Sequence, residues 1–143
     1  MSHTETVKVE MKDKDALTAA VQAIEGASFV KAGNEKYATA DARGKVGTAE
    51  EAHGQHAIYS GTYEGIGVVL PGWNYPVIIN PETGEIKYDN YNGHWGNQDG
   101  LDQLVQGYSV EQIRLEAIRQ GVSVDQETLE NGDVRLLVND YRE

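Results

Sequence analysis

Apolar residues are spaced differently in successive segments of this chain, and the order of these spacings constrains the fold more than any other feature. They alternate with polar residues over residues 4–11, which is typical of a half-buried β-strand. Over residues 17–24 they recur every three or four positions, which indicates a helix that Asp13 or Asp15 can cap. A short apolar run at residues 27–30 predicts a second strand. The chain is therefore expected to open with a strand, a helix and a strand.

Residues 31–56 have a different composition. They contain four glycines, many alanines and, apart from Val46, little aliphatic bulk. Such a segment can bury little apolar surface, so we predict a mobile loop with a turn of helix near residues 48–53. A loop of this length is functional or mobile, or it contains a strand that the spacing does not reveal.

Residues 57–89 have the pattern of β-structure. Short apolar runs at residues 57–59 and 66–70 predict two strands, and residues 75–79 predict a third. Residues 80–84 have the composition of a hairpin turn, and residues 85–89 predict the returning strand. Three prolines lack a backbone donor and should lie at strand ends or on a sheet edge: Pro71, Pro76 and Pro81.

The last third of the chain predicts a long helix and a hairpin. Apolar residues at helical spacing extend over residues 98–120, with a kink or break allowed near Gly107. Residues 122–128 and 134–138 flank an Asn-Gly pair, which favours a β-hairpin. The full order is β-α-β, a loop, β-β-β-β, α and β-β. Because the second helix follows a block of strands, we predict an α+β fold with two main helices and a largely antiparallel sheet.

Length and composition exclude several classes of protein. The 143 residues suit a single domain, residues 1–143. The formal net charge of −11 disfavours direct binding to nucleic acid or to an anionic membrane. The absence of cysteine excludes thiol catalysis and thiolate metal sites. Since no apolar run approaches the ~18 residues of a membrane span and the first residues are neither basic nor apolar, we expect a cytoplasmic protein.

Motifs near both ends of the sequence together resemble a known family. They are Met1-Ser2-His3, a strand with Val7, Lys8 and Val9, Asp15-Ala16-Leu17, Tyr108, Glu116-Ala117, Gln120-Gly121, Asn131-Gly132-Asp133 and Val134-Arg135-Leu136. The chain is similar in these motifs to the domain-of-unknown-function family that includes hypothetical chloroplast reading frame thirty-five. The resemblance implies one cytoplasmic α+β domain and assigns no catalytic residues. Because genes of this family often lie near those of AAA-type ATPases, it also implies an accessory role with such an ATPase as a candidate partner.

Few residues have the spacing of a metal or catalytic site. Glu50, His53 and His56 recur at intervals of three, as a ligand pair on one helix does, but a zinc or iron site needs about three ligands. They are candidates for a metal site, and a solvated polar loop is the simpler interpretation. The chain has no Gly-x-Ser-x-Gly elbow, phosphate-binding loop or dinucleotide fingerprint. We therefore assign no catalytic residue and no cofactor, and expect a protein without enzymatic activity.

The aromatic residues are unevenly distributed. Seven of the eleven lie between Tyr59 and Trp95, and the segment that follows Asp89 is rich in Asn and Gly. Rigid rings beside short amide side chains can stack a flat ligand or bind a protein partner. The alternative is that these rings fill a β-core that has a single Phe. The candidate binding residues are Trp73, Tyr75, Tyr88, Tyr91, Asn92, His94 and Trp95.

Three functions follow from this reading. The first is a binding or accessory protein that recognises a protein partner through the aromatic, Asn/Gly-rich segment. The second is a protein that binds or sequesters a small, nucleotide-like ligand with the same rings. The third is an acidic inhibitor whose carboxylates mimic phosphates. We also expect a homo-oligomer, most simply a dimer, because the apolar residues Leu136, Leu137 and Val138 are consecutive in the last strand.

Overall fold

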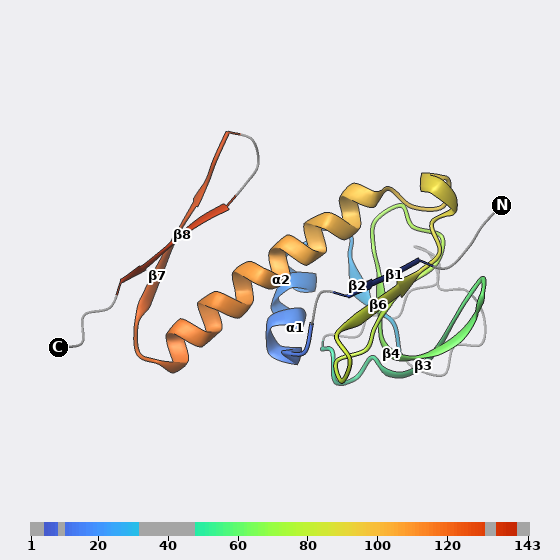
Figure 1. Ribbon diagram of the computed structural model, residues 1–143, viewed down its shortest axis with the longest axis horizontal. Coiled ribbons are helices and arrows are strands. Elements are labelled where there is room, and N and C mark those ends of the chain that lie inside the picture. Colours follow the sequence, from blue (N-terminus) through green and yellow to red (C-terminus); the bar gives the residue numbers. More distant parts are fainter. Residues whose placement is uncertain (1–4, 9–10, 32–47, 131–133, 140–143) are drawn as a thin grey trace.

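The computed structural model describes residues 5–8, 11–31, 48–130 and 134–139. Two helices cover one face of a six-stranded sheet, and a separate two-stranded hairpin follows the second helix (Figure 1). The elements in chain order are β1 (Glu5–Lys8), α1 (Lys14–Gln22), β2 (Ser28–Phe29), β3 (His53–Ile58), β4 (Gly61–Val69), β5 (Val77–Ile79), β6 (Glu85–Tyr88), the 3₁₀ turn η1 (Tyr91–Gly93), α2 (Gln98–Arg119), β7 (Ser123–Thr128) and β8 (Val134–Asn139). The predicted α+β class with a largely antiparallel sheet is confirmed.

All pairings in the main sheet are antiparallel, and the strand order is β1-β6-β5-β4-β2. The long strand β4 holds the sheet together, because β3 and β2 pair with different parts of it. Residues 53–58 of β3 pair with residues 61–66, and residues 28–29 of β2 pair with residues 68–69. The sheet therefore continues beyond β4 through two strands that are far apart in the sequence.

The helix ends follow the sequence closely. The Asp13 carboxylate accepts hydrogen bonds from the backbone nitrogens of Asp15 and Ala16, at 3.0 and 3.2 Å, and so caps α1. Asn97 caps α2 in the same way, and Gly121 follows that helix with φ +77°. The break allowed near Gly107 does not occur, and α2 is a continuous helix of 22 residues.

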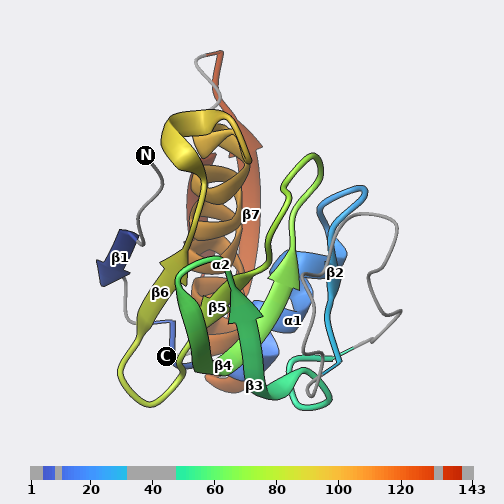
Figure 2. The ribbon, with the colours of Figure 1, turned by 90° about the vertical axis from the view of Figure 1, so that its right-hand side faces the viewer.

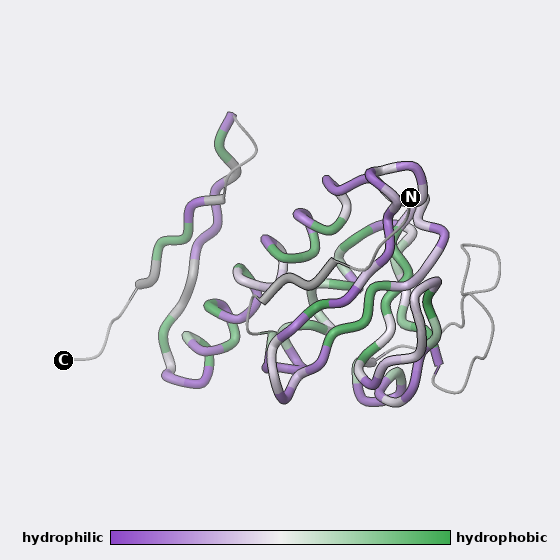
Figure 3. The backbone as a smooth tube through the Cα atoms, turned by 45° about the vertical axis from the view of Figure 1, so that its right-hand side comes forward, coloured by the Kyte–Doolittle hydropathy of each residue, from purple (hydrophilic) through white to green (hydrophobic). Residues whose placement is uncertain are grey.

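The main core lies between the helices and the sheet face that they cover. A Cβ atom at Gly107 would lie 3.7 Å from Cβ of Ala20, an ordinary van der Waals contact, so α1 and α2 lie close together at this point. Figure 3 shows that apolar residues gather in the strands of the sheet and recur at intervals along α2. The largest side chains that are fully buried are Trp73, Tyr108, Phe29, Met11 and Leu17. Among the described residues, no helix is long and apolar enough to cross a membrane.

The turn at residues 80–84 and two of the three prolines lie where the sequence predicts them. The Asn80 side chain accepts hydrogen bonds from the backbone nitrogens of Glu82 and Thr83, and Gly84 has φ +80°. Pro71 and Pro76 lie just outside β4 and β5, as their missing donors require.

The predicted end of the long loop is wrong. The loop expected over residues 31–56 ends earlier, because β3 begins at His53 and Gly54 pairs with Gly65 across the sheet. Two facing glycines provide backbone hydrogen bonds but no side-chain pattern, so the spacing of apolar residues could not reveal this part of the strand. Residues 48–52 form turns. Residues 32–47 lie outside the described part of the chain, and their mobility stays a prediction.

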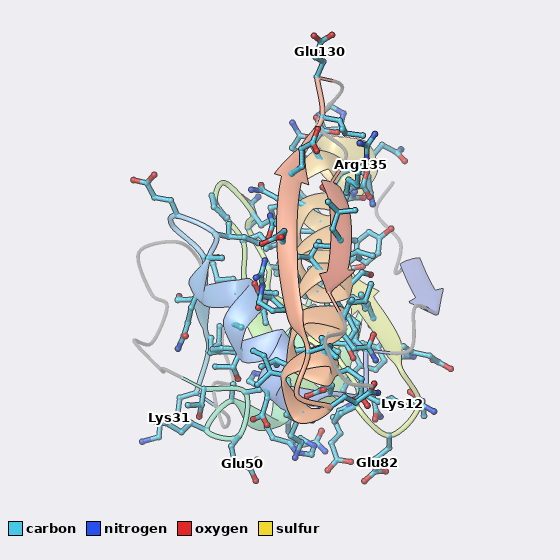
Figure 4. All side chains as sticks on the ribbon, turned by 90° about the vertical axis from the view of Figure 1, so that its left-hand side faces the viewer. Lys12, Lys31, Glu50, Glu82, Glu130 and Arg135 are labelled. Atoms are coloured by element: carbon cyan, nitrogen blue, oxygen red, sulfur yellow. The ribbon has the colours of Figure 1, made fainter. Side chains whose placement is uncertain are left out.

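The β7–β8 hairpin extends away from the main sheet at the carboxyl end of α2 (Figure 1). Both of its strands were predicted, whereas the Asn-Gly turn lies outside the described residues. Figure 4 shows the hairpin in front of α2, with Glu130 pointing outward at its tip. Leu137 is 53% exposed. Within the described chain, the hairpin therefore leaves one large apolar side chain uncovered.

Candidate functional site

The sheet face opposite the helices carries a group of touching aromatic side chains. The Trp95 ring centroid lies 4.8 Å from that of Tyr91, 5.2 Å from that of Tyr75 and 5.3 Å from that of Tyr59. His94 extends the group, with its ring centroid 5.1 Å from that of Tyr91. We call these five side chains the aromatic row. Tyr59 is 55% exposed, Tyr91 and Trp95 are partly exposed, and Tyr75 is buried.

Three separate segments bring the row together. Tyr59 lies in the turn between β3 and β4, Tyr75 in the loop before β5, and the other three rings in or just after η1, all toward one end of the sheet (Figure 2). The Asn74 backbone nitrogen donates to the Trp95 carbonyl at 2.7 Å, and the Trp95 nitrogen donates to the Asn90 carbonyl at 2.9 Å. These bonds join two of the segments, so Trp95 is held by backbone on both sides.

The backbone of η1 has an unusual conformation. Tyr91, Asn92 and Gly93 have φ values of 45°, 52° and 93°, which places three consecutive residues in the left-handed region. Non-glycine residues adopt this region at a cost of about 1–2 kcal/mol each, and such residues cluster at functional sites. In return, this turn presents Asn92 and His94 to solvent, where both side chains are exposed.

Trp73 does not belong to this surface. It is 2% exposed, packs edge-on against Tyr88 with ring centroids 5.7 Å apart, and donates from Nε1 to the Asn97 carbonyl at 3.1 Å. Tyr88 is also in the helix-side core. Trp73 is therefore a core residue and not an exposed binding residue, whereas the buried Tyr88 still lines the hollow beside the row. Trp73 and Tyr75 are two positions apart but pack on different sides of the sheet, because they lie in a loop, where the two-residue period of a strand does not apply.

An open hollow of about 680 Å³ lies beside the aromatic row, at the amino end of α2. It is lined by Tyr88, Asn90, Asn92, Gly93, His94, Asn97 and Gln98. The Gln98 side chain connects several groups here, since its oxygen accepts from Asn90 at 3.3 Å and from the Tyr88 hydroxyl at 3.5 Å. Its amide nitrogen donates to the Asp102 carboxylate at 3.3 Å. The lining has no carboxylate and no amine, so it suits hydrogen bonding to a polar group better than pairing with an anion.

A buried carboxylate lies next to the row. Asp89 is 0% exposed, and its Oδ2 atom accepts a hydrogen bond from the Ser60 backbone nitrogen at 2.9 Å. The other oxygen, Oδ1, has no hydrogen-bond partner among the described residues. No ion pair in the described part of the chain includes Asp89. A buried carboxylate with one bare oxygen is costly, and this one calls for an explanation.

The candidate metal residues do not converge. His56 is buried, and its Nε2 atom lies 2.7 Å from the Ala52 carbonyl, to which it donates in the matching tautomer. Burial lowers the pKa of His56 below its usual 6.5, since the charged ring would lose water; the bond to Ala52 opposes this shift. His53, three positions earlier on β3, points to the opposite face of the strand, and Glu50 pairs with Lys14 at 3.7 Å. The described residues contain no group of three or more potential metal ligands.

The sequence pattern does not predict two residues of this site, Tyr59 and Asp89. Tyr59 has the pattern of a strand residue, yet it lies in the turn and is exposed. Asp89 was read as the end of a strand and carries no motif. Only the approach of Ser60 to Asp89, across 29 positions of sequence, shows that the two belong to one place.

Comparison with protein-family models, with curated proteins and with solved structures finds no match to this chain. The resemblance to the family of chloroplast reading frame thirty-five therefore stays a prediction.

Proposed function

We propose that this chain is a non-enzymatic binding protein of the cytoplasm that recognises a protein partner through the aromatic row. The observation that carries the proposal is a partly exposed Trp95 with its backbone held on both sides and rings against it. Trp and Tyr side chains of this kind dominate the energetics of protein interfaces because they bury a large area at little entropic cost. The left-handed turn of η1 adds fixed polar groups at the edge of this surface.

Backbone hydrogen bonds hold the segments that carry the aromatic row in a fixed position. Asn74 and Asn90 hold the Trp95 backbone, and the backbone of η1 closes through a bond from the His94 nitrogen to the Tyr91 carbonyl at 3.0 Å. A preformed surface loses less entropy on binding than a flexible one. An AAA-type ATPase is the partner class that the family resemblance implies.

The test compares the partly exposed Trp95 with an exposed apolar residue near the other end of α2. Wild-type protein, Trp95→Ala and Ile118→Ala are each immobilised and used to capture proteins from the cells that encode the chain. Ile118 is 61% exposed near the carboxyl end of α2 and serves as the matched control. Captured proteins are identified by mass spectrometry, purified, and measured for affinity.

We expect Trp95→Ala to weaken partner binding by at least about 2 kcal/mol, the loss typical of an interface hot spot. Ile118→Ala should leave the affinity unchanged. Equal affinities for wild type and Trp95→Ala would contradict the proposed function.

A second function is favoured by the hollow. Its volume of about 680 Å³ lies in the range of small-molecule sites, and its amide groups can both donate and accept. Binding of a small, nucleotide-like ligand would give a discrete added mass in native mass spectrometry of freshly purified protein. That added mass should disappear in His94→Ala, and its absence from wild-type protein would count against this function.

The acidic inhibitor has less support. Several described carboxylates pair with basic side chains, as in Asp13–Arg119 at 3.2 Å and Glu127–Arg135 at 3.8 Å, instead of forming a uniform negative array. Phosphate mimicry requires such an array, so we favour partner binding.

We also propose a dimer, in which the exposed Leu137 of β8 is covered by a second copy. A two-stranded hairpin is marginal on its own, and a further strand would stabilise it. Light scattering should give twice the chain mass for wild type and the chain mass for Leu137→Asp. A monomeric wild type at working concentration would rule the dimer out.

A further inference from the structure

We propose that the aromatic row receives a positively charged side chain, Arg or Lys, from a basic segment of the partner. This inference rests on the proposed function and adds the chemistry of the group that the row recognises. It combines three observations: the exposed rings, the bare oxygen of Asp89 and an existing cation on a ring of the same sheet face.

The rings provide the first part of the argument. The face of an aromatic ring is negative, and a cation within about 6 Å of the ring centre is attracted to it. Tyr59 is 55% exposed, and its centroid is 5.3 Å from that of Trp95, so a guanidinium or ammonium group can contact both rings at once. Their planes are inclined by 57°, which forms a corner and not a flat stacking platform. A corner suits a side-chain head group better than a nucleobase.

Asp89 provides the second part. Its chain neighbour Asn90 accepts a hydrogen bond from Trp95, and its own side chain accepts one from Ser60, the residue after Tyr59. The carboxylate therefore lies between the two chain segments whose rings form the corner. It is fully buried and its Oδ1 atom has no partner among the described residues, so its negative charge is poorly compensated inside the protein. Coulombic attraction through a region of low dielectric is strong, and a cation above the rings would relieve this imbalance.

The third observation is that the same face already holds a cation on a ring. Lys87 Nζ lies 4.6 Å from the centre of the Tyr63 ring. Lys87 pairs with Ile78 across the sheet, and Ile78 packs with Tyr75 and Trp95 on the face opposite the helices. Lys87 contacts Tyr63, and no ion pair between Lys87 and Asp89 is present in the described structure. The net charge of −11 also draws basic partners to this protein over long distances.

The experiment uses two peptides that differ only in charge. Acetyl-Gly-Arg-Gly-amide and the same peptide with citrulline, an uncharged isostere of arginine, are titrated into isotopically labelled full-length protein. The chain has two Trp residues, so the indole N–H signals of Trp95 and the buried Trp73 act as probe and internal reference. We expect the arginine peptide to shift the Trp95 signal and to bind about tenfold more tightly than the citrulline peptide, while Trp73 stays unchanged.

Variants separate a specific site from general attraction to an acidic protein. Asp89→Asn removes one charge but keeps an acceptor for Ser60, whereas Glu130→Gln removes one charge at the remote hairpin tip (Figure 4). Asp89→Asn and Tyr59→Leu should each weaken binding of the arginine peptide by about tenfold, and Glu130→Gln should leave it unchanged. Tyr59→Leu changes an exposed side chain, so it decides the question if Asp89→Asn does not fold.

Equal binding of the two peptides, or equal effects of Asp89→Asn and Glu130→Gln, would overturn the inference. If Trp95→Ala nevertheless loses partner binding, the proposed function holds, but the row does not recognise a cationic side chain. Partner binding that survives Trp95→Ala refutes the proposed function instead, whatever the peptides do.

Discussion

The two faces of the main sheet use the same residue types for different purposes. On the helix-covered face, Trp73 is closed in by Tyr88, the start of α2 and the segment around Gly96. On the opposite face, Trp95 contacts three tyrosines and remains partly exposed. The aromatic residues of one segment therefore do not all serve the same purpose. Within about twenty residues of sequence, one tryptophan fills the core and the other forms the candidate binding surface.

The largest effect should come from truncating the two tryptophans separately. Trp73→Ala removes a fully buried ring and should lower the free energy of unfolding by about 3–5 kcal/mol. Trp95→Ala removes a partly exposed ring and should lower it by only about 1 kcal/mol. Urea denaturation followed by circular dichroism measures both. Similar losses for the two variants would mean that the two faces do not differ as described.

A smaller effect is expected from the glycine that packs against Trp73. A Cβ atom at Gly96 would lie 2.2 Å from the ring, so Gly96→Ala must displace the indole and should cost about 1–3 kcal/mol. Gly100→Ala is the milder comparison, because its Cβ would lie 3.2 Å from Nε1 of the same ring, which must then shift by only a few tenths of an ångström, while alanine favours the helix. Gly100→Ala should therefore cost less stability than Gly96→Ala. A Gly96→Ala variant as stable as wild type would show that Trp73 is loosely held.

The smallest effect concerns the polar group buried on the open face. Burial lowers the pKa of His56 in the folded state below the 6.5 of the unfolded chain, so the unfolded state binds more protons near that pH. The stability that neutral His56 allows is thus fully present above pH 6.5 and declines as the pH falls below it. His56→Gln does not titrate and can still donate to Ala52. Urea titrations at several pH values should give a shallower decline for this variant, and parallel curves would exclude His56 as a source of the pH dependence.

Much of the fold could be predicted because local patterns agree with it. The cap at Asp13, the turn at Asn80 and the end of α2 before Gly121 all follow from short-range chemistry. The start of β3 could not be predicted, because His53 and Gly54 become strand residues only through pairing with β4. The same holds for the burial of His56, whose ring occupies the space above Gly67 on the neighbouring strand.

The candidate site was predicted only in part. Tyr91, Asn92, His94 and Trp95 do lie together around η1, as their closeness in sequence requires, and Tyr75 joins them. Trp73 and Tyr88 do not, since both pack in the core on the helix side of the sheet, where their rings contact each other. Tyr59 and Asp89 entered the site through contacts that span about thirty residues of sequence.

By itself, the sequence determined the order of helices and strands, the turns between them, the acidic character and the concentration of rings between Tyr59 and Trp95. These depend on spacing and on residues within a few positions of each other. Only the tertiary structure decided which tryptophan is core and which is surface, and that a buried carboxylate lies next to the chain segments that carry the exposed rings. The physical reason is that burial is a property of the neighbours of a side chain. Those neighbours come from β3, β6 and α2, which the chain brings together only when the sheet has formed.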